Sequence, residues 1–344
     1  MTAASVPEQR PQRATMADVA AAAGVTKTTV SRYLNKHGYV SKTTANRIAK
    51  AMKDLDFTPN RMARSLARQH TNIIIYVIHG DLMSVALDPG LNTHYAAAGA
   101  ELARHGYQIL SMTVNDDIAI RQLQRMLDEG FADGYLFSPN HDDDPILSLF
   151  AGSNVPMVTA GDWAMNAPSI RAVNSDNHTA MRTLTEHMLH RGHRRILYIS
   201  GPTDNSFSQD RIGGFLETMH AADAESHVLH AAGWRAEDGL ALWPQVEPLL
   251  SGIDAVIATN DVMAAGLIQR IQSTGFAVPG DIAVAGFDNT AIASANSPSI
   301  TTIDQHLDRH GTVMADTLLS LIEGNPPADG TIYVPTELVV RESA

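Results

Sequence analysis

The spacing of apolar and polar positions changes near residue 70 of this chain. Beyond that point, short runs rich in Ile, Val and Leu alternate with longer segments whose apolar residues recur at helical spacing. The short runs predict strands and the longer segments predict helices. The predicted strands cover residues 73–79, 107–114, 134–138, 156–160, 195–200, 254–259 and 281–287, and the predicted helices cover residues 95–105, 118–129, 178–191, 212–222, 237–250 and 262–274.

Strands that alternate with helices are typical of parallel sheets with crossover helices. Because the units are too many for one sheet, we expect an α/β fold in which two doubly wound parallel-sheet subdomains follow one another. In such sheets a ligand binds beyond the carboxyl ends of the strands. The pattern therefore predicts a ligand cleft at those ends.

The region before residue 70 has a different pattern, made of short helices. Thr15 and Asp18 form a capping-box-like start for an Ala-rich helix that ends at Gly24. Thr26 can cap a second helix directly afterwards, and Ser41 can cap a third. Two short helices joined by a tight turn that contains glycine form a helix-turn-helix. We therefore expect a small helical head before the α/β body.

The second of these helices has one polar face opposite its apolar stripe. Lys27, Thr28, Ser31 and Arg32 lie on that face, and Thr28 and Arg32 share one side because they are four residues apart. Arginine can donate two hydrogen bonds to guanine, and threonine can contact a base edge or a thymine methyl group. An amphipathic surface helix with a solvated polar side would look the same. The helix alone leaves both interpretations open.

The charge is distributed unevenly along the chain. Residues 1–70 contain 12 Lys and Arg against 4 Asp and Glu, whereas the other 274 residues contain 13 against 33. A basic head on an acidic body is suited to contact with a polyanion through the head. This balance favours nucleic acid as a partner.

Other sequence features limit the class of protein. The chain has no cysteine and no apolar run near the ~20 residues that span a bilayer, and its polar first 15 residues lack the apolar core of a secretion signal. We expect a cytoplasmic protein. It has no phosphate-binding loop, GxGxxG motif or nucleophile elbow, so an enzyme and a cofactor are not expected. The histidines at 187, 190 and 193 and the acidic run 142–144 lack the pattern of a metal site.

Residues 15–66 resemble the DNA-binding head of the LacI/GalR family of bacterial transcription regulators. More than a dozen positions match in fixed spacing. The matching residues are Asp18, Val19, Ala20, Ala23, Gly24, Val25, Thr29, Val30, Ser31, Arg32, Leu34, Asn35, Val40, Ser41, Thr44, Pro59, Asn60, Ala63, Arg64, Ser65 and Leu66.

This resemblance implies roles for individual residues of the head. Lys27, Thr28 and Arg32 would read bases, and Leu66 would be a wedge in the minor groove. Residues 60–68, which include Asn60 and Ala63, would form a hinge helix that folds only on operator DNA. The implied phosphate contacts come from Thr15, Ser31, Asn35, Tyr39, Ser41 and Thr44.

The body resembles the effector domain of the same family, a periplasmic-binding-protein-like pair of subdomains. The resemblance rests on Gly192 to Ile196, Gly201 and Pro202, Arg211, Gly214 and Phe215, Asn260, Asp261 and Ala264, Gly286 to Asp288, and Ser297 to Ile303. It implies that Arg211, Asn260 and Asp288 contact a small-molecule effector and that Trp234 packs on it. These residue types suit hydroxyl groups and a sugar ring.

The first half of the body departs from the family pattern. Many relatives have an aromatic pair after the first strand, where this chain has residues 80–83, and an Asp where this chain has Gly161. Asp81 follows the first predicted strand and is a candidate ligand contact. The effector is therefore not identified by the resemblance.

Together these features predict a dimeric transcriptional regulator, favoured as a repressor, that binds a pseudo-palindromic operator under control of a small molecule. A sugar is the favoured effector; a nucleoside or purine, control by a partner protein, and a carbohydrate-binding enzyme are the alternatives. No Leu heptad follows residue 341, which favours a dimer. The expected organisation is a disordered tail (1–14), the head (15–58), the hinge (59–70) and the effector domain (71–344), whose subdomains are 71–173 with 304–333 and 174–303 with 334–344.

Overall fold

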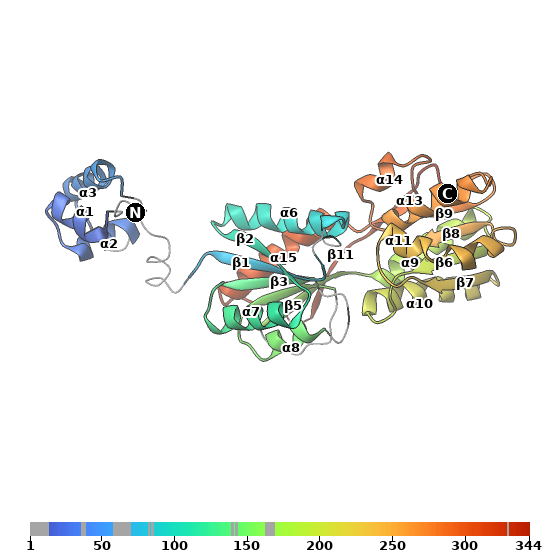
Figure 1. Ribbon diagram of the computed structural model, residues 1–344, viewed down its shortest axis with the longest axis horizontal. Helices are drawn as coiled ribbons and strands as arrows, with labels where there is room; N and C mark the ends of the chain where they lie inside the picture. The colour runs from blue at the N-terminus through green and yellow to red at the C-terminus, as the bar shows by residue number, and fades with distance from the viewer. Residues whose placement is uncertain are drawn as a thin grey trace, which may run out of the picture. The chain divides into compact units, whose positions relative to one another are not determined.

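The fold is described from a computed structural model, in which the chain divides between Thr71 and Asn72 into two compact units (Figure 1). We treat each unit by itself. Among the helices of the described residues, none is long and apolar enough to cross a membrane. The described residues are 14–35, 39–57, 70–81, 83, 86–138, 141, 144–161, 169–328 and 330–344.

The first unit contains three short helices around a small apolar core. They are α1 (Met16–Ala23), α2 (Lys27–Asn35) and α3 (Lys42–Asp54). The Thr15 amide donates a hydrogen bond to the Asp18 carboxylate at 2.8 Å, and the Asp18 amide donates one to the Thr15 hydroxyl. The predicted capping box is therefore confirmed. Gly24 ends α1 with φ 61°, a left-handed conformation that glycine adopts at little cost. The helix-turn-helix predicted from the sequence is present.

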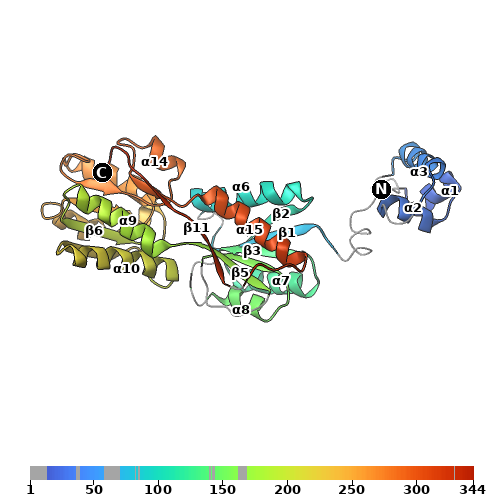
Figure 2. The same ribbon diagram turned by 180° about the vertical axis from the view of Figure 1, so that it is seen from behind.

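The first lobe of the second unit is a six-stranded parallel sheet in the order β11-β5-β4-β3-β1-β2. Helices α6 and α15 cover one face and α7 and α8 cover the other, as Figure 2 shows from behind. The strands are β1 (Ile73–His79), β2 (Gln108–Val114), β3 (Gly134–Ser138), β4 (Met157–Ala160), β5 (Ile170–Ser175) and β11 (Thr331–Val334). The helices are α6 (Pro89–Arg104), α7 (Asp117–Asp128), α8 (Pro145–Ala151) and α15 (Leu307–Ile322).

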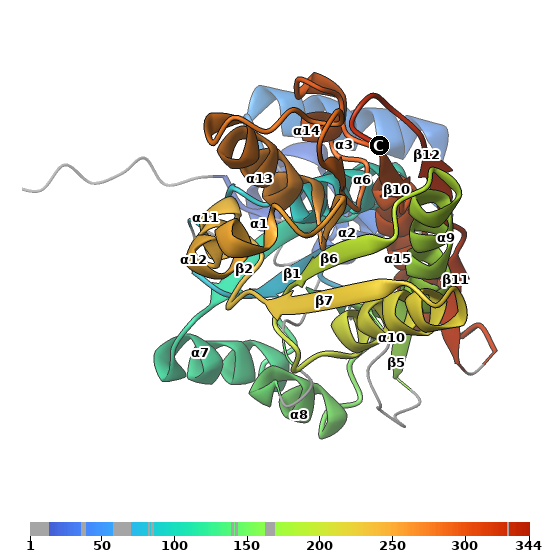
Figure 3. The same cartoon turned by 90° about the vertical axis from the view of Figure 1, so that its right-hand side faces the viewer.

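The second lobe repeats this plan with a four-stranded parallel sheet in the order β7-β6-β8-β9. Helices α9 and α10 pack on one face, and α12 and α13 on the other (Figure 3). The strands are β6 (Arg195–Ser200), β7 (Glu225–His230), β8 (Ala255–Ala258), β9 (Ala283–Ala285) and the antiparallel pair β10 (Thr302–Asp304) and β12 (Glu337–Val339). The helices are α9 (Asn177–His190), α10 (Ser206–Ala221), α11 (Ala236–Leu240), α12 (Trp243–Val246), α13 (Asp261–Ser273) and α14 (Ala291–Ala295).

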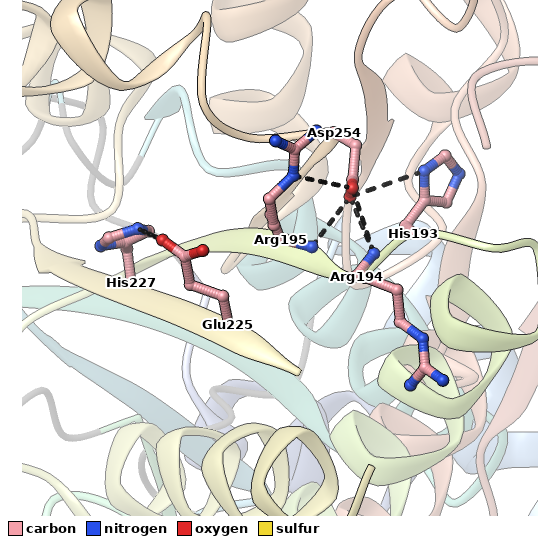
Figure 4. A network of polar contacts seen from close by, with 6 residues as sticks. All are labelled: His193, Arg194, Arg195, Glu225, His227 and Asp254. Atoms are coloured by element: carbon pink, nitrogen blue, oxygen red, sulfur yellow. Dashed lines mark hydrogen bonds and ion pairs between the residues drawn. The ribbon is translucent and has the colours of Figure 1, made fainter. Parts of the chain in front are cut away.

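One carboxylate fixes the start of the second sheet. Asp254 accepts hydrogen bonds from the backbone amides of Arg194 and Arg195 at 3.0 and 3.1 Å, and the Arg195 Nε and His193 ring lie at 3.5 and 3.9 Å (Figure 4). Arg195 is the first residue of β6, and Asp254 directly precedes β8, so these contacts lie at the amino ends of the two strands. The family-like run from Gly192 therefore aligns two strands at the end opposite their carboxyl termini.

The structure confirms the two doubly wound sheets and corrects several elements. The predicted helix over residues 237–250 is wrong as one element, because Pro244 and Pro248 cannot donate the helical hydrogen bonds; the segment forms α11, α12 and a 3-10 turn (Glu247–Leu249). Helix α6 begins six residues before the predicted position, where Asp88 accepts from the Leu91 amide at 2.9 Å. Strands β5, β7, β10, β11 and β12 were not predicted.

Candidate functional site

A cavity of about 660 Å³ lies between the two lobes of the second unit, at the carboxyl ends of the strands. We call this cavity the cleft. From the first lobe it is lined by residues that end β1, β3, β4 and β5 and by the first turns of α6 and α15. From the second lobe it is lined by α10, the segment 232–238 and the start of α13. The cleft predicted from the strand pattern is therefore present, and its volume is in the range of small-molecule sites.

The five candidate effector residues come from distant parts of the sequence and all line this cleft. They are Asp81, Arg211, Trp234, Asn260 and Asp288. Asp81 is exposed, and its carboxylate accepts a hydrogen bond from the Met83 amide at 3.0 Å. The other four come from the second lobe.

Arg211 is a buried cation that its neighbours hold in one position. Its Nε donates to Asn177 Oδ1 and its Nη1 donates to the Thr259 carbonyl, both at 2.8 Å. The guanidinium carbon lies 3.8 Å from the centre of the Phe287 ring, a favourable cation–π distance. Burial lowers the pKa of Arg211, and the Asp288 carboxylate acts in the opposite direction. The result is a fixed positive charge in the cleft.

Asp288 lies on an unusual backbone, with φ 106°. Its Oδ1 accepts a hydrogen bond from Gln305 Nε2 at 2.6 Å, and its amide donates to the Ile303 carbonyl at 2.8 Å. Burial raises the pKa of the Asp288 carboxyl well above its usual range, although Arg211 opposes this shift. The carboxyl therefore holds a proton more readily than an ordinary aspartate, and in that form it can donate as well as accept a hydrogen bond.

Asn260 and Trp234 are joined through the backbone. The Asn260 side chain caps α13 by accepting from the Met263 amide at 2.8 Å, and its Nδ2 donates to the Trp234 carbonyl at 2.7 Å. The Trp234 ring packs at 5.1 Å from the Phe207 ring, and a Cβ at position 201 would overlap it. Gly201 thus leaves room for the aromatic wall, and Asn260 holds that wall in place.

Sequence reasoning missed several residues of the first lobe that also line the cleft. They are His79, Asp88, His94 and His310, together with Gln305. His94 and His310 lie inside helices, and the sequence there shows only the apolar spacing of a helix. Nothing in it indicates that these two histidines reach the cleft. His79 pairs with the buried Asp144 at 2.6 Å, which raises the pKa of His79.

One ion pair joins loops of the two lobes. His141 Nδ1 lies 2.5 Å from Asp204 Oδ2, and both side chains are about half exposed. His141 precedes α8 of the first lobe and Asp204 precedes α10 of the second. The pair therefore spans the two lobes beside the cleft.

A metal site is not assigned to any of these groups. Among the described residues, Glu101, His105 and Asp316 bring ligand atoms within 4.8 Å of one another, but they are largely exposed and Glu101 already pairs with Arg104. Exposed acidic groups of this kind are common on protein surfaces without an ion. Of the histidines considered from the sequence, His193 contacts Asp254 (Figure 4).

The head presents the polar face that the sequence predicts. Lys27, Thr28 and Arg32 of α2 are exposed, whereas Val30 is buried against α1 and α3. Tyr39 is 91% exposed.

Two of the implied phosphate contacts lie at helix starts. Thr15 caps α1, and Ser41 caps α3 by accepting from the Thr44 amide at 3.2 Å. Helix N-termini attract phosphates because their amide groups point outward. Ser31 is half-buried. The Asn35 side chain and residues Asn60, Ala63 and Leu66 lie outside the described part of the chain.

Comparisons with known proteins agree with this architecture. Residues 15–60 match the family described as bacterial regulatory proteins, lacI family, and residues 185–344 match the periplasmic binding protein-like domain. The chain is 30% identical over 338 residues to the HTH-type transcriptional regulator CelR of Thermobifida fusca, covering 97% of this chain and 99% of that protein.

Two solved structures are similar over nearly the whole chain. A structure described as a transcriptional regulator CelR–cellobiose complex has 29% identity and a TM-score of 0.75, covering 96% of this chain and 100% of that one. The lac repressor dimer bound to operator and the anti-inducer ONPF has 26% identity and a TM-score of 0.83, covering 96% and 99%.

Proposed function

This chain belongs to the lacI family of bacterial regulatory proteins, and from that membership we propose that it represses transcription as a homodimer on a pseudo-palindromic operator and responds to a sugar in its cleft. It is a DNA-binding transcriptional regulator, and its relatives are controlled by small molecules. The observation that carries the sugar assignment is the meeting of Arg211, Trp234, Asn260 and Asp288 in one cleft.

The α2 face supports the DNA-binding half of the proposal. Lys27, Thr28 and Arg32 are exposed side by side on one short helix, so they can enter a major groove together. Thr15 and Ser41 lie at helix starts, where phosphates bind. The two basic heads of a dimer would release counterions from the phosphates they contact, so operator affinity should fall steeply with salt.

The charge of the cleft supports a neutral ligand rather than an anion. Asp81, Asp88 and Asp288 line it, whereas two of the donors of Arg211 already bind Asn177 and Thr259. These acidic groups oppose the positive charge of Arg211, and part of that guanidinium is already occupied by its own contacts, so a phosphate or carboxylate would gain little net attraction. Hydroxyl groups can instead donate to the carboxylates and accept from amides.

The aromatic wall supports a ligand with an apolar ring face. Trp234 and Phe207 pack against each other beside the polar groups, and Asn260 fixes the Trp234 backbone. A pyranose has C–H groups on one face and hydroxyls at its edge, which suits an aromatic surface next to carboxylates. The similar structure described as a CelR–cellobiose complex adds support for a saccharide.

The coupling between ligand and DNA must be reciprocal. If the sugar weakens operator binding by a given factor, operator DNA weakens sugar binding by the same factor. A ligand can shift the relation of the lobes only if it binds one arrangement more tightly than another. Because residues of both lobes line the cleft, a ligand there can make that distinction.

The test begins with selection of preferred duplexes from random-sequence DNA, followed by fluorescence anisotropy at several salt concentrations. We expect a preference for one half-site sequence and a duplex affinity that falls steeply as salt increases. We also expect that affinity to change when cellobiose or another neutral saccharide is added. Arg32→Ala should lose about 1–3 kcal/mol of discrimination at one base pair. Arg182→Ala, an exposed arginine of the body, is the control.

The outcomes separate the parts of this proposal. Equal affinity for selected and scrambled duplexes would contradict the DNA-binding assignment. Sequence preference without a response to any saccharide would contradict the sugar assignment, and nucleosides would be titrated next.

A further inference from the structure

Within the described part of the second unit, the chain passes between the two lobes three times. It passes from β5 of the first lobe into α9 of the second, from β10 back into α15, and from β11 into β12. We call these three passages the crossovers. Because each lobe is built on its own sheet, a change in the relation of the lobes must be accommodated at the crossovers. A side chain that bonds both to a crossover and to a ligand-binding group is therefore placed to relate one to the other.

Asn177 joins Arg211 to the first crossover. It is the first residue of α9, and its side chain is buried. Its Oδ1 accepts from Arg211 Nε at 2.8 Å, and its Nδ2 donates to Asn174 Oδ1 at 3.2 Å and to the Ser175 carbonyl at 3.1 Å. Asn174 and Ser175 end β5, in the first lobe. One amide group therefore connects the buried cation of the second lobe with the end of a strand in the first.

Gln305 joins Asp288 to the second crossover. It lies between β10 and α15, and its Nε2 donates to Asp288 Oδ1 at 2.6 Å. The residue after Asp288 is bonded in the same region: Asn289 Nδ2 donates to Asp304 Oδ2 at 2.8 Å, and Asn289 Oδ1 accepts from Arg341 Nη2 at 2.6 Å. Asp304 ends β10, and Arg341 follows β12, the strand that the third crossover enters. The turn that carries Asp288 is thus bonded beside two crossovers.

The other second-lobe candidates for ligand contact are bonded differently. Among the described residues, Asn260 bonds to the Met263 amide and the Trp234 carbonyl, which both belong to the second lobe. The Trp234 ring packs on Phe207 of the same lobe. The contacts therefore separate two kinds of group in the cleft. The charged groups are bonded to the crossovers, whereas the amide and the aromatic ring are bonded within their own lobe.

We propose that Asn177 and Gln305 are positioning residues that convert the binding of a ligand at Arg211 and Asp288 into a change in the arrangement of the lobes. This inference rests on the proposed sugar-responsive function of the same cleft. A ligand that bonds to the Arg211 guanidinium or the Asp288 carboxyl competes with the amides of Asn177 and Gln305 or displaces them. The bonds at the crossovers then differ between the free and the bound protein, which is what a coupling free energy between ligand and DNA requires.

The two bonds of Asn177 can be separated by substitution. In Asn177→Asp the carboxylate keeps an acceptor for Arg211 Nε but loses the donor to Asn174 and Ser175. Asn177→Leu removes both bonds at a similar side-chain volume. Asn154→Asp is the matched control, because Asn154 is exposed, precedes β4 and lies outside the cleft.

Gln305→Met tests the second crossover independently. Methionine keeps the length of the side chain but has no donor for Asp288. Gln272→Met is its matched control, because Gln272 is an exposed residue of α13 outside the cleft.

The quantity to measure is the coupling factor, which is the ratio of operator dissociation constants with and without saturating cellobiose or another neutral saccharide that the wild type binds. Fluorescence anisotropy gives this factor, and calorimetry gives the sugar affinity of each variant. We expect Asn177→Asp and Gln305→Met to bring the coupling factor closer to one by at least about fivefold. Asn177→Leu should also weaken sugar binding more than Asn177→Asp does, because it leaves Arg211 without its acceptor. Both controls should keep the wild-type coupling factor.

Thermal unfolding separates a positioning role from a packing role. A variant whose Tm falls while its coupling factor stays at the wild-type value would assign that residue to packing and overturn the inference for it. Because the two crossovers are altered by different variants, either variant that folds gives a result. A wild-type operator affinity that responds to none of the saccharides would overturn the proposed function and this inference with it. A wild-type response that Asn177→Asp and Gln305→Met keep in full would overturn this inference alone.

Discussion

The two walls of the cleft obtain their polar groups in different ways. On the second lobe, Arg211 and Asn260 are hydrogen-bonded to neighbouring groups before any ligand arrives. On the first lobe, His94 and His310 each leave a buried ring nitrogen without a partner among the described residues. The polar groups of the second wall are held in position by their own contacts, whereas two buried ring nitrogens of the first wall have no partner among the described residues.

This difference suggests a division of work between the lobes. Groups fixed by neighbours lose little entropy on binding and set a common geometry. Buried nitrogens without partners instead cost stability, because they have lost their bonds to water and gained none in the protein. The second lobe therefore offers preorganised groups to a ligand in the cleft, whereas the two buried nitrogens of the first lobe reduce the stability of the fold.

The largest expected effect is the loss of a fixed group from the second wall. Arg211→Ala removes a buried cation with its two hydrogen bonds, leaves Asn177 Oδ1 and the Thr259 carbonyl without that donor, and removes the charge that opposes the rise in the pKa of Asp288. We expect the free energy of unfolding, measured by urea denaturation, to fall by about 3 kcal/mol or more.

Arg182→Ala is the matched control. Arg182 is half exposed and lies 3.8 Å from Glu186, so its loss should change the free energy of unfolding by less than about 0.5 kcal/mol. If the two variants differed by less than 1 kcal/mol, the description of the second wall as fixed by Arg211 would be wrong.

A smaller effect is expected when the aromatic part of the second wall is displaced. In Gly201→Ala the new Cβ would overlap the Trp234 ring, which must move away from Phe207. We expect a loss of about 1–3 kcal/mol in stability from overpacking, a shift of the tryptophan emission, and weaker sugar binding.

Gly252→Ala provides the control for this variant. A Cβ at position 252 would lie 3.4 Å from the Leu249 carbonyl, at ordinary contact distance, and this residue is outside the cleft. Emission and sugar affinity should match the wild type. Unchanged emission in Gly201→Ala would show that the aromatic wall has more freedom than the second-wall description allows.

The two walls also differ in how far the sequence predicts them. Asn260 and Asp288 lie two and three residues after β8 and β9, within short runs that resemble family motifs, so their position at the carboxyl ends of these strands could be predicted. His94 and His310 are separated by most of the body and meet only because α6 and α15 cross at Gly311. No local pattern reports such a crossing, since it depends on the packing of two helices on one sheet face.

The same reasoning explains the errors in the fold. Strands β1, β3 and β6 are apolar runs and were predicted with their observed bounds. Strand β5 was missed because it buries the polar residues Arg171 and Asn174, whose type argues against a buried strand. A residue's type indicates only how often such residues are buried on average. Whether a particular residue is buried depends on its place in the fold.

The pH dependence of stability should have opposite sign on the two walls. Burial raises the folded pKa of Asp288 above its unfolded value near 3.8, so the stability it contributes is present at low pH and is lost as pH rises through the folded pKa. Burial lowers the folded pKa of His94 from 6.5 to about 4, so its contribution is present above pH 6.5 and is lost as pH falls toward 4.

Two variants isolate these contributions. Between pH 4.5 and 6.5, the free energy of unfolding of Asp288→Asn relative to wild type should increase with pH, and that of His94→Leu relative to wild type should decrease, each by at most about 1.4 kcal/mol per pH unit. Urea denaturation across this range measures both slopes. Slopes of the same sign would contradict the contrast drawn between the walls.

The smallest effect is expected at the ion pair that joins the walls. His141 and Asp204 lie 2.5 Å apart but are about half exposed, so solvent screens their attraction. Asp204→Asn should change the free energy of unfolding by less than about 0.5 kcal/mol and weaken sugar binding by no more than about twofold. If calorimetry instead showed a loss of sugar affinity of tenfold or more, the exposed loops that carry this pair would be needed for sugar binding, in addition to the groups inside the cleft.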